Sequence, residues 1–185
     1  MTVEDIIKLV CEFVGEREIY EKLSSDENLS EREQEKVDLM TRCFNLVNQE
    51  IASDYLPLLT KEEVDCADNI LNLSVLSKNA IQIHGIKNRF GINLRFKAFP
   101  TYVEASGVPK TVTYSYFPSE LSLSDEVEMP FGLSARVYAY GVASEYLLID
   151  GVSEDAEIWE NRYKQSLFML SQKHGEHILP KRRWR

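Results

Sequence analysis

"MPFGLSARVYAYGVASEYLLIDGVSEDAEIWENRYKQSLFML", residues 129–170, is the stretch that decides the fold of this chain. It predicts two helices joined by a very short turn at Gly151 and Ser153, because glycine is favoured just after a helix and serine just before one. We expect Pro130 in the first helical turn, where proline is well tolerated. A connection this short forces the helices to run antiparallel. The sequence therefore predicts a helical hairpin over residues 130–174.

The first helix of this hairpin has a face of small side chains. Ala135, Ala139 and Ala143 lie four residues apart, which places them on one side of a helix. Because methyl groups take little room, we expect this face to let another helix approach closely.

Two more helices are predicted near the N-terminus. The first starts after Thr2, a favoured N-cap residue, and ends or bends at Gly15. The second starts at Ser30, which a glutamate follows three residues later as in a capping box, and stops at Pro57. The stretch "SSDENLSEREQ", residues 24–34, is polar and typical of a loop.

The middle of the chain has the alternation of polar and apolar residues that indicates strands. It is clearest in "AIQIHGI" (80–86), "INLRFKAF" (92–99) and "TVTYSYF" (111–117), separated by the turn-like stretches "KNRFG" and "EASGVPK". We therefore expect several antiparallel strands with one long hairpin.

The predicted fold class is α+β: a helical bundle built from both chain ends, with an inserted antiparallel β-sheet and hairpin. We see no linker that would divide the chain, and predict a single domain over residues 1–185. Its parts are N-terminal helices (1–60), a β-rich insert with a long hairpin (61–120), the helical hairpin (130–174) and a C-terminal docking arm (175–185).

Charge is segregated along the chain. The net charge of −9 divides into −10 for residues 1–65, +4 for residues 66–118 and −3 for residues 119–185. Such segregation suits a protein that meets charged surfaces on different sides, although acidic helix faces beside a less charged sheet would give the same numbers. The basic residues around the predicted hairpin are Lys87, Arg89, Arg95 and Lys97.

The cysteines and the apolar runs indicate the compartment. Cys11, Cys43 and Cys66 are odd in number and have no close spacing, which fits a reducing environment better than a disulfide framework. The start "MTVEDIIKLV" is acidic, unlike a signal peptide, and no apolar run is long enough to cross a bilayer. We expect a soluble protein, made inside the cell and without membrane contact.

A search for catalytic patterns finds none with a recognisable signature. There is no phosphate loop, dinucleotide fingerprint or nucleophile elbow. His84 lies in a predicted strand, and a structural role is the favoured interpretation. His174 and His177 could share a metal ion, but no third ligand has a suitable spacing. We predict no catalytic residue, no metal and no cofactor, and hence no enzyme.

The end of the chain, "LPKRRWR", gathers four positive charges around one tryptophan. Arginine and tryptophan are the side chains most enriched at binding hot spots. We interpret the segment as an arm that docks on an acidic or aromatic pocket of a neighbour, with a basic tail that aids solubility as the alternative. The candidate docking residues are Lys181, Arg182, Arg183, Trp184 and Arg185.

The order of these parts resembles the head–tail connector (portal adaptor) proteins of tailed bacteriophages. "LMTRCFNLVNQEIASDYLPLL" (39–59) is similar to their early helix. The stretch from "TVTYSYFPSELSLSDEVEMP" through the hairpin (111–170) is similar to their strand, acidic linker and Ala/Gly-rich helical hairpin. "EIW…RY" and the closing "RRW" are similar as well. The resemblance covers roughly residues 35–185 and depends on architecture rather than on a catalytic signature.

The resemblance implies a structural virion protein, made in the host cytoplasm, that forms a homomeric ring, twelve-fold in this group. Such a ring joins the portal to the tail and passes genomic DNA without sequence-specific binding. The arm at residues 181–185 would dock on the portal protein, and other surfaces would receive a downstream tail or nozzle protein. An acidic lumen would let DNA slide, and Glu31, Glu33 and Glu35 are candidates to face it.

Two surfaces are candidates for contacts inside such an assembly. Lys87, Arg89 and Phe90 of the predicted hairpin are candidates for intersubunit or tail contact, because their charges could pair with acidic helices. The small face at Ala135, Ala139 and Ala143 suits lateral packing of wedge-shaped subunits.

Two other functions stay open. A tail-completion or tail-terminator ring protein would share much of this pattern, although the helix-rich ends favour the adaptor. The alternative from a different class is a small cytosolic enzyme or regulatory domain with an unrecognised site.

Overall fold

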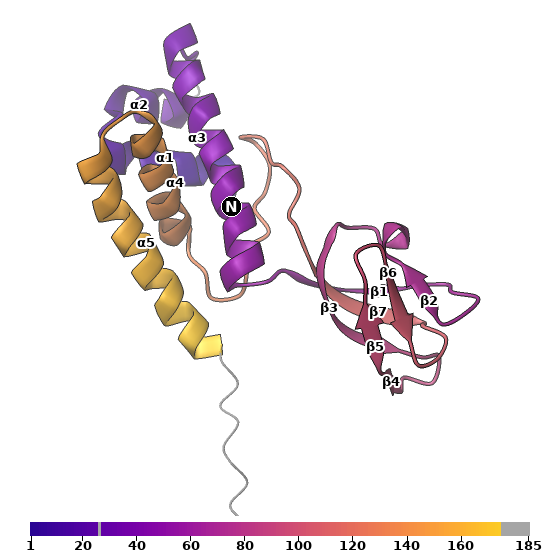
Figure 1. The fold of residues 1–185 in the computed structure, drawn as a ribbon. Coiled ribbons are helices and arrows are strands. Elements are labelled where there is room, and N and C mark those ends of the chain that lie inside the picture. The colour runs from indigo at the N-terminus through magenta and orange to yellow at the C-terminus, as the bar shows by residue number, and fades with distance from the viewer. Residues whose placement is uncertain (26, 175–185) are drawn as a thin grey trace, which may run out of the picture. The chain divides into compact units, whose positions relative to one another are not determined.

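The computed structural model describes residues 1–25 and 27–174, and it has the predicted α+β class. The chain forms two compact units (Figure 1). The helical unit comprises residues 1–44 and the segment from residue 122 onward, and the sheet unit comprises residues 45–121. Where the sequence analysis expected one domain with an insert, the structure thus separates the insert as a compact unit of its own.

The first helix of the helical unit, α1 (Val3–Val14), begins and ends at the predicted residues. The Thr2 hydroxyl accepts a hydrogen bond from the backbone N–H of Asp5, and the Asp5 carboxylate accepts one from the N–H of Thr2 at 2.9 Å. This capping box satisfies two backbone donors at the helix start. Gly15 ends the helix with φ +83°, a conformation that glycine adopts without strain.

The next helix, α2 (Arg17–Ser25), was not predicted. Its apolar contacts come from Ile19 and Leu23, which are buried and lie four residues apart. The loop expected over residues 24–34 is correspondingly shorter, because α3 (Glu31–Glu50) begins directly after Ser30. Ser30 donates to the Glu33 carboxylate from both its N–H and its hydroxyl, at 2.7 and 2.6 Å, which forms half of the predicted capping box.

Helix α3 buries the stripe that its spacing predicts, from Val37 through Met40, Phe44 and Val47 to Ile51. After Glu50 the backbone widens into one π-helical turn, Ile51–Tyr55, in which the Leu56 N–H donates to the Ile51 carbonyl at 2.7 Å. Helical backbone therefore ends two residues before Pro57, as expected for a proline that disfavours helix in the residue before it.

The helical hairpin consists of α4 (Ala135–Ile149) and α5 (Ser153–His174), which lie side by side in Figure 1. The turn at Gly151 and the start at Ser153 are as predicted, and Gly151 has φ +85°. The predicted start at Pro130 is wrong. Gly132 has φ +84°, which a right-handed helix cannot contain, so the helix starts only after Ser134.

Aromatic rings connect four helices of the helical unit. The ring of Phe13 in α1 stacks on Trp159 of α5 at a centroid distance of 4.7 Å and on Tyr140 of α4 at 5.4 Å. Phe44 of α3 packs against Tyr138 of α4 at 5.5 Å. Such contacts add to the free energy that burial of the rings already provides.

The sheet unit contains two antiparallel sheets in the described chain. The first has the order β1-β7-β3-β4 and the second the order β2-β6-β5. The strands are β1 (Leu59–Glu63), β2 (Ile70–Asn72), β3 (Ala80–Lys87), β4 (Asn93–Leu94), β5 (Phe96–Ala98), β6 (Tyr102–Ala105) and β7 (Thr111–Tyr116). A short 3₁₀ turn, Leu73–Val75, follows β2.

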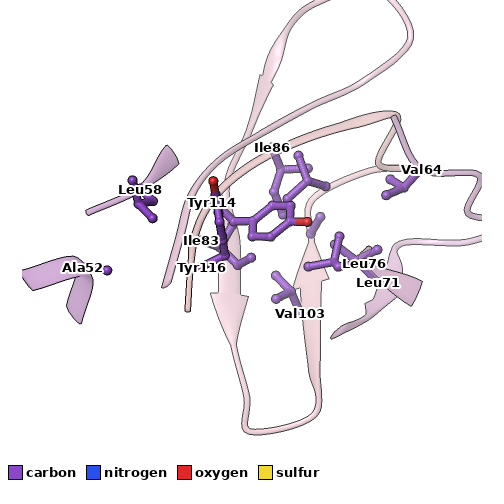
Figure 2. Close-up of a cluster of buried hydrophobic side chains, with 12 residues drawn as sticks. Ala52, Leu58, Val64, Leu71, Leu76, Ile83, Ile86, Val103, Tyr114 and Tyr116 are labelled. Carbon is purple, nitrogen blue, oxygen red and sulfur yellow. The ribbon is translucent and has the colours of Figure 1, made fainter. Parts of the chain in front are cut away.

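The core of the sheet unit gathers around β7, which pairs with β1 on one side and β3 on the other. Figure 2 shows the ring of Tyr114 beside Ile83, Ile86 and Val103. Ile83 and Ile86 belong to β3 of the first sheet and Val103 to β6 of the second, so both sheets contribute to this core. The predicted single long hairpin is wrong. Strand β4 pairs with β3 through only two residue pairs, and β5 then turns into the second sheet, so the chain makes two short hairpins instead.

The two ends of the sheet unit are joined by a reciprocal pair of hydrogen bonds. The Asn45 side-chain amide donates to the carbonyl of Leu121, and the Leu121 N–H donates to the Asn45 side-chain oxygen, both at 2.9 Å. Residues that lie 76 positions apart in the sequence are therefore held together by one side chain.

Candidate functional site

The turn between β3 and β4 is shaped by Asn88. Its side-chain oxygen accepts hydrogen bonds from the N–H groups of Phe90 at 2.9 Å and Ile92 at 3.0 Å. Its backbone N–H donates to the carbonyl of Ile92, and its carbonyl accepts from Gly91, each at 3.0 Å. Gly91 has φ +77°, which allows the chain to reverse here. One asparagine thus fixes the conformation of a five-residue turn, because its side chain replaces the backbone partners that strands would provide.

The turn presents apolar side chains to solvent. Phe90 is 70% exposed and Ile92 is 61% exposed, although both are large hydrophobic residues. The guanidinium of Arg89 lies over the Phe90 ring, 4.6 Å from its centroid. A cation over an aromatic face is attracted by the ring quadrupole, so the two side chains form one amphipathic protrusion.

Two other segments reach the same end of the sheet. The Lys110 N–H donates to the carbonyl of Lys87 at 2.8 Å, and the Val64 N–H donates to the carbonyl of Lys110 at 2.9 Å. Between these segments lies a hollow of about 640 Å³. We call this region the hairpin-end surface; it is lined by Asp65, Cys66, Asn88, Arg89, Phe90, Val108, Pro109 and Lys110.

The hairpin-end surface combines apolar walls with charged edges. Val108 is 49% exposed, and Lys110 pairs with Asp65 at 3.2 Å. Burial, together with the nearby carboxylates of Asp68 and Asp65, raises the pKa of the Cys66 thiol. The thiol therefore stays protonated at neutral pH and behaves as a small apolar group. Such a surface suits contact with another macromolecule better than covalent chemistry at this cysteine.

The predicted contact residues of the hairpin do lie together at this place. Lys87 is the last residue of β3, and Arg89 and Phe90 follow in the turn, all three exposed. The sequence analysis did not include Val108 or Asp65, which are distant in the chain. Only the pairing of β7 with both β1 and β3 brings them to the turn.

The small face of α4 is largely covered inside the helical unit. Ala139 and Ala143 have no accessible surface in the chain, and Ala135 is half-buried. Helix α4 packs against both α1 and α5, so these methyl groups permit close packing inside the helical unit. The side chains of Ala139 and Ala143 are therefore covered by the chain itself, and Ala135 is the only one of the three with accessible surface.

A second hollow, of about 630 Å³, lies in the helical unit. Carboxylates from α2, α3 and the end of α4 surround it, and its apolar lining includes Ile19, Leu39 and Tyr146. We call it the acid-rimmed hollow. Its charged lining residues are Glu16, Glu18, Arg32, Glu33, Glu35, Lys36 and Asp150. The sequence analysis missed this feature because it did not predict α2, although the spacing of Ile19 and Leu23 was a usable signal.

Some of these carboxylates are already paired. Glu33 accepts hydrogen bonds from Lys22 and Ser30, which lower its pKa to about 2, and Glu16 pairs with Lys36 at 2.5 Å. Burial raises the pKa of Tyr146 to about 12, and the charges of Glu16 and Asp150 add to this shift. Among the side chains that the structure describes, those of residues 1–25 and 27–170, Glu18 and Glu35 have no ion-pair partner. The hollow therefore carries unneutralised negative charge.

The remaining predicted residues are placed as follows. Glu31 and Glu35 are exposed at the start of α3, whereas Glu33 is half-buried in its contact with Lys22. His84 is exposed on β3, and the backbone of α5 ends at His174. The docking residues Lys181, Arg182, Arg183, Trp184 and Arg185, and also His177, lie outside the described residues.

The described part of the chain contains no group of three or more His, Cys, Asp or Glu side chains that could hold a metal ion. Within the same residues, no helix combines the length and apolar character that crossing a bilayer requires. No protein-family profile matches the chain, and no curated protein matches it significantly.

Proposed function

We propose that this chain is a structural protein of a tailed-phage virion, which forms a homomeric ring between the portal and the tail. The observation that carries the proposal is the order of its parts. Helices from both chain ends form one unit, and a β-rich unit is inserted between them. This order and the stretches quoted above resemble the portal adaptors, whose function requires contact surfaces rather than a reactive centre.

The hairpin-end surface supports the proposal. Its Phe90 and the adjoining Ile92 are exposed, which would be costly for a protein without partners, because exposed apolar patches favour association. In the proposed ring this surface contacts a neighbouring subunit or the downstream tail or nozzle protein. The net charge of −9 also fits a channel through which DNA passes without being held.

The arm at residues 179–185 provides the test of the portal contact. We expect the full chain to bind a purified portal ring and a variant that lacks residues 179–185 to lose this binding. Size-exclusion chromatography with light scattering measures complex formation, and circular dichroism checks that the truncated chain keeps its helical content. A truncated chain that binds the portal equally well would contradict the docking role.

The same experiment separates the proposal from its alternatives. A tail-completion ring would bind tail components but not the portal. An enzyme or regulatory domain would bind neither and would remain a monomer in the presence of both. If the full-length chain binds neither the portal nor the tail proteins, the proposed function is therefore overturned.

A further inference from the structure

The hairpin-end surface carries positive charge that the chain does not neutralise. Neither Arg89 nor the adjoining Lys87 forms an ion pair with the described side chains, those of residues 1–25 and 27–170. The sequence around them, residues 66–118, has a net charge of +4. Arg89 and Phe90 protrude together, because the Asn88 hydrogen bonds hold the turn and the guanidinium lies on the ring. The protrusion is therefore a preformed cationic and aromatic anchor.

The acid-rimmed hollow has the complementary properties. Its lining contains five carboxylates and two cationic side chains, and its apolar residues offer contact area for a ring. Its volume of about 630 Å³ leaves ample room for one phenyl group with a guanidinium beside it. Glu18 and Glu35, which lack an ion-pair partner, are available to receive an arginine.

We propose that Arg89 and Phe90 of one copy dock in the acid-rimmed hollow of a second copy, a contact that rests on the proposed ring. The occupant is another copy of this chain because the opposite charges and the matching apolar surfaces are both present in the same sequence. Arginine and aromatic side chains at the centre of an interface are the usual energetic anchors. Each copy offers one anchor and one hollow, so the contact is head-to-tail and can close into a ring.

Charge exchange tests this contact. Arg89→Glu places a carboxylate against the acidic rim, and Glu35→Arg places a cation against the anchor, so each single variant should weaken self-association about tenfold or more. The double variant R89E/E35R restores opposite charges and should return the association constant to within about threefold of the original. Sedimentation equilibrium of the full chain at an ionic strength of about 0.15 M, where the Debye length is about 8 Å, measures these constants.

Matched controls separate the contact from general charge effects. Lys97→Glu changes the net charge as Arg89→Glu does, and Glu157→Arg matches Glu35→Arg; both control residues are exposed and lie outside the two surfaces. We expect the controls to change association less than about threefold, because charges beyond the Debye length are screened. Circular dichroism confirms that each variant is folded.

The outcomes distinguish this contact from the ring itself. If the R89E and E35R variants associate as strongly as the wild-type chain, the docking contact is overturned, but the proposed ring is not. A double variant that associates no better than the singles also overturns it. Chain that stays monomeric at its solubility limit overturns the contact with a second copy, whereas failure of the proposed function additionally requires that the portal and tail proteins are not bound.

Discussion

The hydroxyl of Tyr114 donates a hydrogen bond of 2.7 Å to the carboxylate of Glu62, and this bond connects β7 to β1. The same carboxylate accepts bonds from the N–H of Ser77 at 3.1 Å and from its hydroxyl at 2.9 Å. The hydrogen bond from Tyr114 is the main reason why the pKa of Glu62 is lowered. A single ionised side chain thus joins two strands and the loop before β3.

Tyr114→Phe should lower the local unfolding free energy of β7 by about 1–2 kcal/mol at neutral pH, because it removes a hydrogen bond to a charged acceptor. A lowered folded-state pKa stabilises the native state above the unfolded value of about 4.3, and this contribution is lost as the pH falls through the folded value. The difference between wild type and variant should therefore shrink in acid. Hydrogen exchange of the β7 amides at several pH values measures it.

Tyr102→Phe is the control for this prediction, because the hydroxyl of Tyr102 has no hydrogen bond among the described residues. We expect its effect to be below about 0.5 kcal/mol at every pH. A penalty for Tyr114→Phe that does not depend on pH would contradict the role of the Glu62 charge.

Removal of the Phe13 ring should destabilise the helical unit. Phe13 stacks on both Trp159 and Tyr140, but it is only half-buried, so we expect Phe13→Ala to cost about 2 kcal/mol. Urea unfolding followed by tryptophan fluorescence reports the change, since Trp159 belongs to the cluster. Met169→Ala, at an exposed position of α5, should cost less than about 0.5 kcal/mol. Equal effects of the two variants would show that the stacked rings add no stability.

A larger side chain on the covered face of α4 should be poorly tolerated. Ala143→Leu adds three carbon atoms where no surface is accessible, so overpacking should cost about 1–3 kcal/mol. Ala135→Leu, at a half-buried position of the same face, should cost less. Thermal unfolding followed by circular dichroism compares the two. If Ala143→Leu were neutral for stability but abolished self-association, the result would support the predicted subunit contact of this face and contradict its packing role.

The Asn88 side chain should control the mobility of the turn. Asn88→Ala removes the acceptor for the Phe90 and Ile92 amides, and we expect the protection of both amides against hydrogen exchange to fall about tenfold. Asn88→Asp keeps an acceptor oxygen and should retain most of the protection. Unchanged exchange in Asn88→Ala would mean that the backbone alone holds the turn.

Local sequence patterns were sufficient to predict the helix ends that are fixed by capping residues. Thr2 and Gly15 set α1, Gly151 and Ser153 set the turn of the helical hairpin, and each acts within a few residues. The position of Gly132 was a similar signal, but the preference of proline for first helical turns led to a start that was too early. The sequence alone does not show whether Pro130 or Gly132 decides where the helix starts; the positive φ of Gly132 does.

Pairing between distant segments was beyond the sequence. The alternation in β3 and β7 indicates strands but not partners, so the expected long hairpin became a β3–β7 pair with two short hairpins. The same limit applies to the candidate surfaces. Arg89 and Phe90 could be selected as an exposed cluster, whereas Val108, Asp65 and the whole acid-rimmed hollow depend on contacts across the chain. The spacing of Ala139 and Ala143 shows that a partner must be close, but not that the partner is α1 and α5.

The paired hydrogen bonds between Asn45 and Leu121 hold the first and last residues of the β-rich unit next to each other, so the unit is a cassette inserted at a single point. A segment mounted in this way can be lengthened, shortened or exchanged during evolution without rerouting the rest of the polypeptide, because the two flanking pieces meet at the same point whatever lies between them. Recognition of new neighbours could thus diversify in the cassette while the helices keep their framework.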